Sequence, residues 1–263
     1  MRINFRRFLY LFTLILYLGC TNQEVTHSKK TLNIAVAANM QFAMREIVAK
    51  FEQKENVNVE LMIGASGKLT NQIINGAPFH LFVSADTSYT QEIIKAGKGV
   101  RNQYIYAIGS LVLWTNNPKF KETNLFSLLE KETVSKISIP NPITSPYGLQ
   151  AKLALEKAGL WKKISSKIVV GESIAQSTQY VYARICEIGF TAKSVLYSPE
   201  LKDKGIWQEV PSHLYKQIYQ GLIITKWGEE KNKMQVESFL SFMKSMEVKK
   251  ILFNNGYQLP LKE

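Results

Sequence analysis

Two turns in the first third of the sequence combine residue types that suit the binding of an anion. The apolar run 32–38 stops at Asn39, and the run 57–63 stops at Gly64, which opens a Gly-Ala-Ser-Gly turn around Ser66. Apolar residues at helical spacing follow each turn, so each is predicted to aim free backbone N–H groups and the positive end of a helix dipole at one spot. Asn39 is also predicted to be an N-cap. An ordinary helix cap without a ligand is the alternative for both turns.

Other kinds of site find less support in the sequence. The Gly-Lys pair at 67–68 lacks both the glycine five residues earlier and the Ser or Thr directly after it that a phosphate-binding P-loop requires. The histidines His27, His80 and His213 have no metal-ligand spacing, and no Ser-His-Asp signature or close pair of acids stands out. Asp86 is predicted to cap the helix after it. Nothing in the sequence requires an enzyme.

The elements that must position these turns alternate along the chain. The predicted strands are 32–38, 57–63, 80–85, 104–114, 137–140, 169–171, 189–192 and 219–225, and a C-terminal helix follows the last of them. Strands that alternate with helices predict an α/β fold whose ligands gather at the carboxyl ends of parallel strands. Asn39 and Ser66 lie at two such ends. Two further helices are predicted to open at a Pro-Tyr-Gly turn that contains Tyr147 and at Ile174.

Residues 1–19 have the features of an export signal. Three arginines precede an apolar stretch that is too short to span a bilayer comfortably. The stretch ends at Gly19-Cys20, which is similar to a bacterial lipoprotein signal, so Cys20 is predicted to be acylated and to become the mature N-terminus. Residues 20–31 would then form a polar tether, and a cleaved, soluble form is the alternative. With Cys20 lipidated, Cys186 has no disulfide partner and is predicted to be a small buried residue.

The net charge of the chain and the distribution of its basic residues indicate which kinds of partner it can bind. The formal net charge is +12, and loss of the three arginines of the export signal leaves about +9. Such an excess is typical of proteins that meet nucleic acid, an anionic ligand or an anionic surface. The remaining arginines, Arg45, Arg101 and Arg184, are isolated, and the lysines are scattered in ones and twos. Nucleic acid is therefore not an expected partner.

Several motifs, taken together and in order, resemble the molybdate-binding protein of bacterial ABC importers. They are Ala38-Asn39, the run 64–69, Asn75-Gly76-Ala77-Pro78, Ser84-Ala85-Asp86, the run 106–114, the run 141–148 and Gly189-Phe190-Thr191-Ala192. The resemblance covers residues 32–263. It is strongest to a branch with asparagine in the first ligand loop and a Pro-Tyr-Gly turn. Ala38 stands where some members have threonine, and Ala192 stands where many have tyrosine.

The resemblance implies a periplasmic-binding-protein type II fold, in which two α/β lobes are joined by two crossing strands. The crossings are expected near residues 107–108 and 220–221. The first lobe would comprise residues 32–107 plus 222–263, and the second would comprise residues 108–221. Carried over position by position, the ligand contacts fall at Ala38, Asn39, Ser66, Tyr147 and Ile174.

The function that the resemblance implies is capture of molybdate, and of tungstate, through its oxygens, without an enzymatic step or a cofactor. Backbone amides, the Ser66 hydroxyl, the Asn39 side chain and the Tyr147 phenol are the expected donors, whereas Lys68 is expected to point to solvent. The implied partners are an ABC permease with its ATPase, and the membrane through a lipid anchor on a monomeric periplasmic or cell-surface protein. Three alternatives remain: a binding protein for sulfate or phosphate, an enzyme on a similar two-lobed fold, and a lipid-anchored structural or sensor protein.

Overall fold

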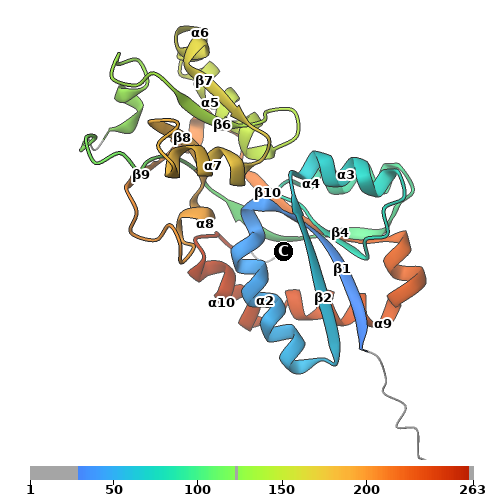
Figure 1. Ribbon diagram of the computed structural model, residues 1–263. Helices are drawn as coiled ribbons and strands as arrows, with labels where there is room; N and C mark the ends of the chain where they lie inside the picture. The colour runs from blue at the N-terminus through green and yellow to red at the C-terminus, as the bar shows by residue number, and fades with distance from the viewer. Residues whose placement is uncertain (1–28, 122–123, 261–263) are drawn as a thin grey trace, which may run out of the picture.

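The computed structural model describes residues 29–121 and 124–260 (Figure 1). The predicted export signal and Cys20 lie outside the described residues. The described chain forms two five-stranded sheets, each with its own helices and its own hydrophobic core. Figure 1 shows the two halves one above the other, joined where β10 and β4 run between them.

The first sheet is formed mainly by the N-terminal part of the chain. Its strands are β1 (Lys30–Ala37), β2 (Val57–Gly64), β3 (Leu81–Val83), β4 (Gly99–Gly109) and β10 (Ile218–Thr225), in the order β2-β1-β3-β10-β4. β1 pairs in parallel with β2 and β3, whereas β10 is antiparallel to β3 and β4. β1 lies inside the sheet, between β2 and β3, and this explains its almost continuous apolar run, because such a strand is covered on both faces.

Helices cover both faces of this sheet. They are α2 (Gln41–Lys54), α9 (Lys226–Met243) and α10 (Met246–Asn254) on one face, and α3 (Ser66–Ile74) and α4 (Thr87–Lys95) on the other. On the first face, the ring centroids of Phe51 and Phe239 lie 5.0 Å apart in an edge-on contact. On the second face, Leu69 and Ile73 of α3 pack on Phe82 of β3. The helices on both faces of the sheet are amphipathic, and each packs its apolar side against the sheet.

The second sheet is formed by the middle of the chain. Its strands are β5 (Leu111–Thr115), β6 (Ile137–Pro140), β7 (Ile168–Gly171), β8 (Ile188–Ala192) and β9 (Ile206–Glu209), in the order β7-β6-β8-β5-β9. Its α-helices are α5 (Pro146–Lys157), α6 (Trp161–Ile164), α7 (Ile174–Tyr182) and α8 (Lys193–Leu196). Short 3-10 turns are η1 (Ala38–Met40) in the first half, and η2 (Leu125–Leu128), η3 (Ser165–Lys167) and η4 (Ser212–Leu214) in the second. Trp114 is fully buried in this core, and its Nε1 donates to Lys204 O at 2.8 Å.

The chain passes between the sheets twice. It leaves the first sheet after Gly109 and enters the second at Leu111, and it returns between Glu209 and Ile218. The prediction of one strand over 104–114 was therefore wrong, because this apolar run forms two strands that belong to different sheets. Both parts are buried, so hydrophobicity does not change where the sheet changes.

Two further expectations need correction. Asn39 does not cap a helix, because η1 includes it and α2 begins only at Gln41. The C-terminal helix is two helices, and Ser245 caps the second by accepting a hydrogen bond from Val248 N at 3.3 Å. The predicted cap at Asp86 is confirmed, since its carboxylate accepts from Ser88 N at 2.7 Å. No helix within the described ranges has both the length and the apolar character needed to cross a membrane.

Candidate oxyanion-binding site

A small cavity lies where the carboxyl ends of strands from the two sheets face each other. Its space comes to about 190 Å³ only when the open solvent at its mouth is counted. The residues that line it are Ala37, Ala38, Asn39, Gly64, Ala65, Ser66, Ala85, Ser145, Pro146, Tyr147 and Ile174. All five residues that the sequence nominated as ligand contacts are among them, and each is at most 4% exposed. Residues that are far apart in the sequence thus line one cavity.

Helix geometry supplies the cavity with hydrogen-bond donors. Ser66 and Ile174 are the first residues of α3 and α7, and Tyr147 follows Pro146 at the start of α5. The first N–H groups of a helix have no acceptor within that helix, and they lie at the positive end of its dipole. Because proline has no N–H, Tyr147 carries the first amide of α5. Three helices therefore direct their opening amides at the cavity.

The Ser66 side chain adds a donor to these amides. Its Oγ accepts a hydrogen bond from Ala85 N at 3.1 Å, and the serine is almost completely buried. A hydroxyl group has one proton to donate besides its acceptor sites. Since Oγ already accepts from the protein, its proton is available to an acceptor in the cavity.

The Asn39 side chain differs from the expectation that it would donate to the ligand. Its Nδ2 donates to Gln220 Oε1 at 3.0 Å and to Tyr257 Oη at 3.2 Å, which uses both of its protons. The backbone carbonyl oxygen of Asn39 accepts from Tyr257 Oη at 3.0 Å and from Ser194 Oγ at 3.2 Å. Asn39 therefore contributes its backbone to the cavity wall, while its side chain holds the turn in place.

Beneath the cavity, the described part of the chain contains a buried network that the sequence did not reveal. It joins Asn39, Tyr106, Tyr147, Ser194, Gln220 and Tyr257. Burial raises the pKa of Tyr106 and of Tyr147 well above the usual value of a phenol, so both hydroxyl groups stay protonated at neutral pH. The sequence feature that could have indicated this network is Gln220, a polar residue in a largely apolar predicted strand.

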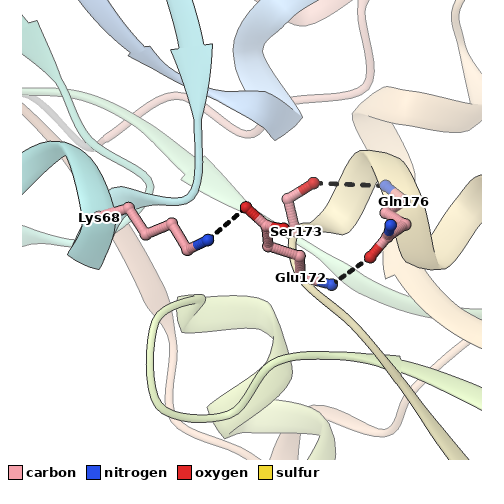
Figure 2. Close-up of polar contacts among 4 residues, drawn as sticks. All are labelled: Lys68, Glu172, Ser173 and Gln176. Carbon is pink, nitrogen blue, oxygen red and sulfur yellow. Dashed lines mark hydrogen bonds and ion pairs between the residues drawn. The ribbon is translucent and has the colours of Figure 1, made fainter.

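Charged side chains are absent from the described lining of the cavity. The basic residue that is nearest to the lining residues in the sequence is Lys68, and its side chain forms an ion pair with Glu172 of the other half, as Figure 2 shows. Their side chains are 48% and 60% exposed, so Lys68 is half in solvent but not unpaired. An anion in this cavity would be held by neutral dipoles. Among the described residues, no group of His, Cys, Asp and Glu side chains is placed to hold a metal ion.

The opening of the cavity is bridged by contacts between the two halves. Gly67 N donates to Thr144 O at 2.9 Å, and the Tyr89 hydroxyl donates to Ile143 O at 3.2 Å. The ion pair from Lys68 ends at Glu172, which lies just ahead of α7. We call these three contacts, between residues 67–89 and residues 143–172, the rim contacts.

The start of α7 is also fixed by hydrogen bonds among residues 172–176. Ser173 Oγ accepts from Gln176 N at 3.3 Å, and the Gln176 side chain accepts from Glu172 N at 2.6 Å (Figure 2). This arrangement is similar to a capping box with glutamine at N3, except that the glutamine accepts from the residue before the cap and not from the cap itself. It orients the first turn of the helix, and with it the amide of Ile174.

These features define an extracytoplasmic solute-binding protein of the type II periplasmic-binding-protein fold, with one polar cavity between two α/β halves. The chain belongs to the bacterial extracellular solute-binding protein family, which it matches over residues 32–258. The predicted fold is confirmed. The family consists of binding proteins and not of enzymes, as the sequence predicted.

Individual relatives agree with this assignment. The molybdate-binding protein ModA of Azotobacter vinelandii is 33% identical over 247 residues, which are 94% of this chain and 97% of that protein. The putative ABC transporter substrate-binding lipoprotein YvgL of Bacillus subtilis is 29% identical and covers 92% of this chain and 93% of its own length. The solved structure of the A. vinelandii periplasmic molybdate-binding protein matches with a TM-score of 0.82 at 29% identity, over 88% of this chain and 100% of that chain. The predicted resemblance to molybdate-binding proteins is thus confirmed.

Proposed function

We propose that the protein captures molybdate, and also tungstate, between two lobes and delivers it to an ABC permease with its ATPase. The observation that carries this proposal is the convergence of helix-opening amides from both halves on one uncharged cavity. The names of the A. vinelandii relatives supply the identity of the anion. The proposed contacts are Ala38, Asn39, Ser66, Tyr147 and Ile174.

The two lobes are proposed to be residues 32–107 plus 222–263 and residues 108–221. In support of this division, the strands that cross between the sheets pair with each other, with Gln220 opposite Ala107 and Tyr219 opposite Ile108. A pair of strands can bend as a hinge while each lobe keeps its own core. Closure about this hinge would bring the opening turns of α3, α5 and α7 onto the anion.

Neutral donors suit a fully deprotonated oxyanion. Each hydrogen bond to a charged acceptor contributes roughly 1.5–3 kcal/mol, so several of them can hold a dianion without an arginine or a lysine. A protonated phosphate species carries an O–H group that must donate a hydrogen bond. The proposed contacts offer this group donors and no acceptor. A site built in this way rejects such a ligand, because a buried polar group is left unpaired. Sulfate, which is also fully deprotonated, is the second candidate, and only the size of the closed cavity separates it from molybdate.

Calorimetric titration with molybdate, tungstate, sulfate and phosphate tests the proposal. We expect tight binding of molybdate and tungstate, much weaker binding of sulfate, and no detectable binding of phosphate. Phosphate bound as tightly as molybdate would contradict the neutral-donor mechanism. Sulfate preferred over molybdate would instead leave the mechanism intact and change the physiological ligand.

We also propose export and a lipid anchor at Cys20, which makes this a periplasmic or cell-surface protein. The name of the B. subtilis relative supports the anchor. Cell fractionation tests this, since the wild-type protein is expected with the membranes and Cys20→Ala is expected to be absent from them. A Cys20→Ala variant that remains with the membranes would contradict lipidation at this residue.

A further inference from the structure

We propose that Gln220 is a positioning residue that fixes the two sides of the cavity relative to each other and so sets which tetrahedral oxyanion fits. It acts through Asn39 and Tyr147 and does not touch the ligand itself. This inference rests on the proposed function of the cavity, and it assigns the size selection of that cavity to a single side chain at the hinge.

Gln220 lies at the junction of the two halves. It belongs to β10, pairs with Ala107 of β4 and is fully buried. The register between β10 and β4 shifts between Gln220 and Gly221. Irregularities of this kind in a ladder re-aim side chains. The Gln220 side chain accordingly points toward Asn39 and Tyr147, which line the cavity.

The amide group of Gln220 joins one cavity residue from each half. Its Oε1 accepts from Asn39 Nδ2 at 3.0 Å, and its Nε2 donates to Tyr147 Oη at 3.0 Å. The Tyr106 hydroxyl lies 2.8 Å from the same Oε1 and supports this orientation of the amide. Asn39 belongs to the turn after β1, and Tyr147 belongs to the first turn of α5. One planar group thus sets the separation of two opposite walls.

The direction of these hydrogen bonds determines the orientation of the Tyr147 phenol. Because Tyr147 Oη accepts from Gln220, its proton must point to another acceptor. Tyr147 lines the cavity, so a bound anion can be that acceptor. If the Gln220 amide were rotated by half a turn, Nε2 would face the Asn39 donor, and Oε1 would accept the hydrogen bond that the Tyr147 phenol could otherwise donate to the anion. The observed orientation avoids both losses.

The backbone of the crossing strand packs directly on this pair. A Cβ atom at Gly109, the last residue of β4, would collide with the Tyr147 hydroxyl and lie 2.5 Å from Gln220 Nε2. Only glycine allows so close an approach of the backbone. Since this point is where the chain passes between the halves, their angle and the contact between Gln220 and Tyr147 cannot change independently. Removing the amide is therefore expected to loosen the angle of closure.

Gln220→Met is the informative variant, because methionine has a similar shape but neither donates nor accepts in place of the amide. Thr225→Val is the matched control on the same strand. Thr225 is buried, accepts from Gly228 N at 3.0 Å and caps α9, and it is not among the residues that line the cavity. Both variants lose a buried polar group, so both are expected to melt at a lower temperature than the wild type. Only Gln220→Met is expected to change anion selection.

The measurement is calorimetric titration of wild type, Gln220→Met and Thr225→Val with molybdate and with sulfate. We expect Gln220→Met to lose roughly tenfold or more in affinity for the preferred anion and to show a smaller ratio between the two affinities. Thr225→Val is expected to keep the wild-type ratio. An unchanged ratio in Gln220→Met would overturn the inference, whichever anion the wild type prefers. A wild type that prefers sulfate would refute the proposed ligand but not the role of Gln220.

Gln220→Glu provides a second test that keeps the shape of the side chain. A carboxylate still accepts from Asn39 but cannot donate to Tyr147, and it would instead accept a hydrogen bond from the Tyr147 phenol. We expect this variant to bind the anion even more weakly than Gln220→Met, because it adds a buried negative charge and redirects the Tyr147 donor. Binding at wild-type strength by the folded variant would contradict the inference.

Discussion

The two halves of the protein are linked in two places of different character. Below the cavity, a buried network joins Asn39, Tyr147 and Gln220 through directional hydrogen bonds. At the opening, the rim contacts join exposed or backbone groups, including the ion pair between Lys68 and Glu172. A buried polar group that loses its partner costs about 1–3 kcal/mol, whereas an exposed ion pair contributes about 0–1 kcal/mol. We therefore expect the buried network to determine the shape of the cavity and its affinity for the anion. The rim contacts are expected to stabilise the closed arrangement only slightly.

The largest effect is expected from Ser66→Ala, which removes a donor from inside the cavity. Loss of one charge-assisted hydrogen bond lowers molybdate affinity by about 10- to 100-fold. Calorimetric titration measures this loss. Ser138→Ala is the matched control, because Ser138 is equally buried but its hydroxyl contacts Ser177, away from the cavity. Equal losses in the two variants would show that Ser66 acts through general stability and not through the anion.

An intermediate effect is expected from Gly67→Ala at the rim. A Cβ atom there would lie 3.0 Å from Thr144 Cα and 3.2 Å from both Thr144 O and Tyr89 Cε1. The neighbouring backbone must move by a few tenths of an ångström, which holds the rim slightly open. We expect molybdate affinity to fall about fivefold, at the lower limit of the cost of overpacking, with a faster dissociation rate. Stopped-flow measurement of dissociation checks this, and a rate equal to that of the wild type would contradict it.

A smaller effect is expected from Lys68→Met, which removes the exposed ion pair of the rim. Molybdate affinity should change by no more than about threefold at low salt, and the difference should vanish at high salt. Lys163→Met is the matched control, since Lys163 forms an exposed ion pair with Glu130 at 2.8 Å within the second half. Titration at two salt concentrations makes the comparison. A loss as large as that of Ser66→Ala would mean that the lysine charge acts on the anion.

The smallest effect is expected from a change of pH on molybdate affinity, because the phenols at the base of the cavity stay protonated. Burial raises the pKa of Tyr106 and Tyr147 well above the usual 10.0, so neither residue titrates between pH 7 and 9 in the folded protein. Molybdate affinity is expected to stay constant over that range. Above about pH 10 the unfolded chain releases phenol protons that the folded protein retains, so the free energy of unfolding falls as the pH rises. Affinity that declines between pH 7 and 9 would contradict a buried, neutral network.

Much of this architecture was accessible from the sequence, because strands and helices alternate and helix-opening turns are short. β6, from Ile137 to Pro140, lies where it was predicted, and Ser66, Tyr147 and Ile174 line one cavity as the resemblance implied. Local signals suffice for the strand and for the helix openings, since the apolar period and the turn residues reflect short-range constraints. The convergence of the three helix openings came from the resemblance.

What the sequence could not provide depends on contacts between distant residues. Apolar periodicity alone gave no sign that the run 104–114 changes sheet at Ser110, because it is buried on both sides of that point. Only the family resemblance suggested a crossing inside this run. The Asn39 side chain was assigned to the ligand, since nothing local indicates that Gln220 and Tyr257 use both of its protons. The ion pair of Lys68 likewise depends on Glu172, more than a hundred positions away.

A crystal structure of the mature protein with molybdate tests the central claim most directly, because anomalous scattering locates the molybdenum atom. We expect the anion in the cavity between the halves, with its oxygens accepting from the amides of Ser66, Tyr147 and Ile174 and from the Ser66 hydroxyl. The rim ion pair should remain outside the ligand contacts. Molybdate held by a lysine or arginine side chain, or bound elsewhere on the protein, would contradict the account.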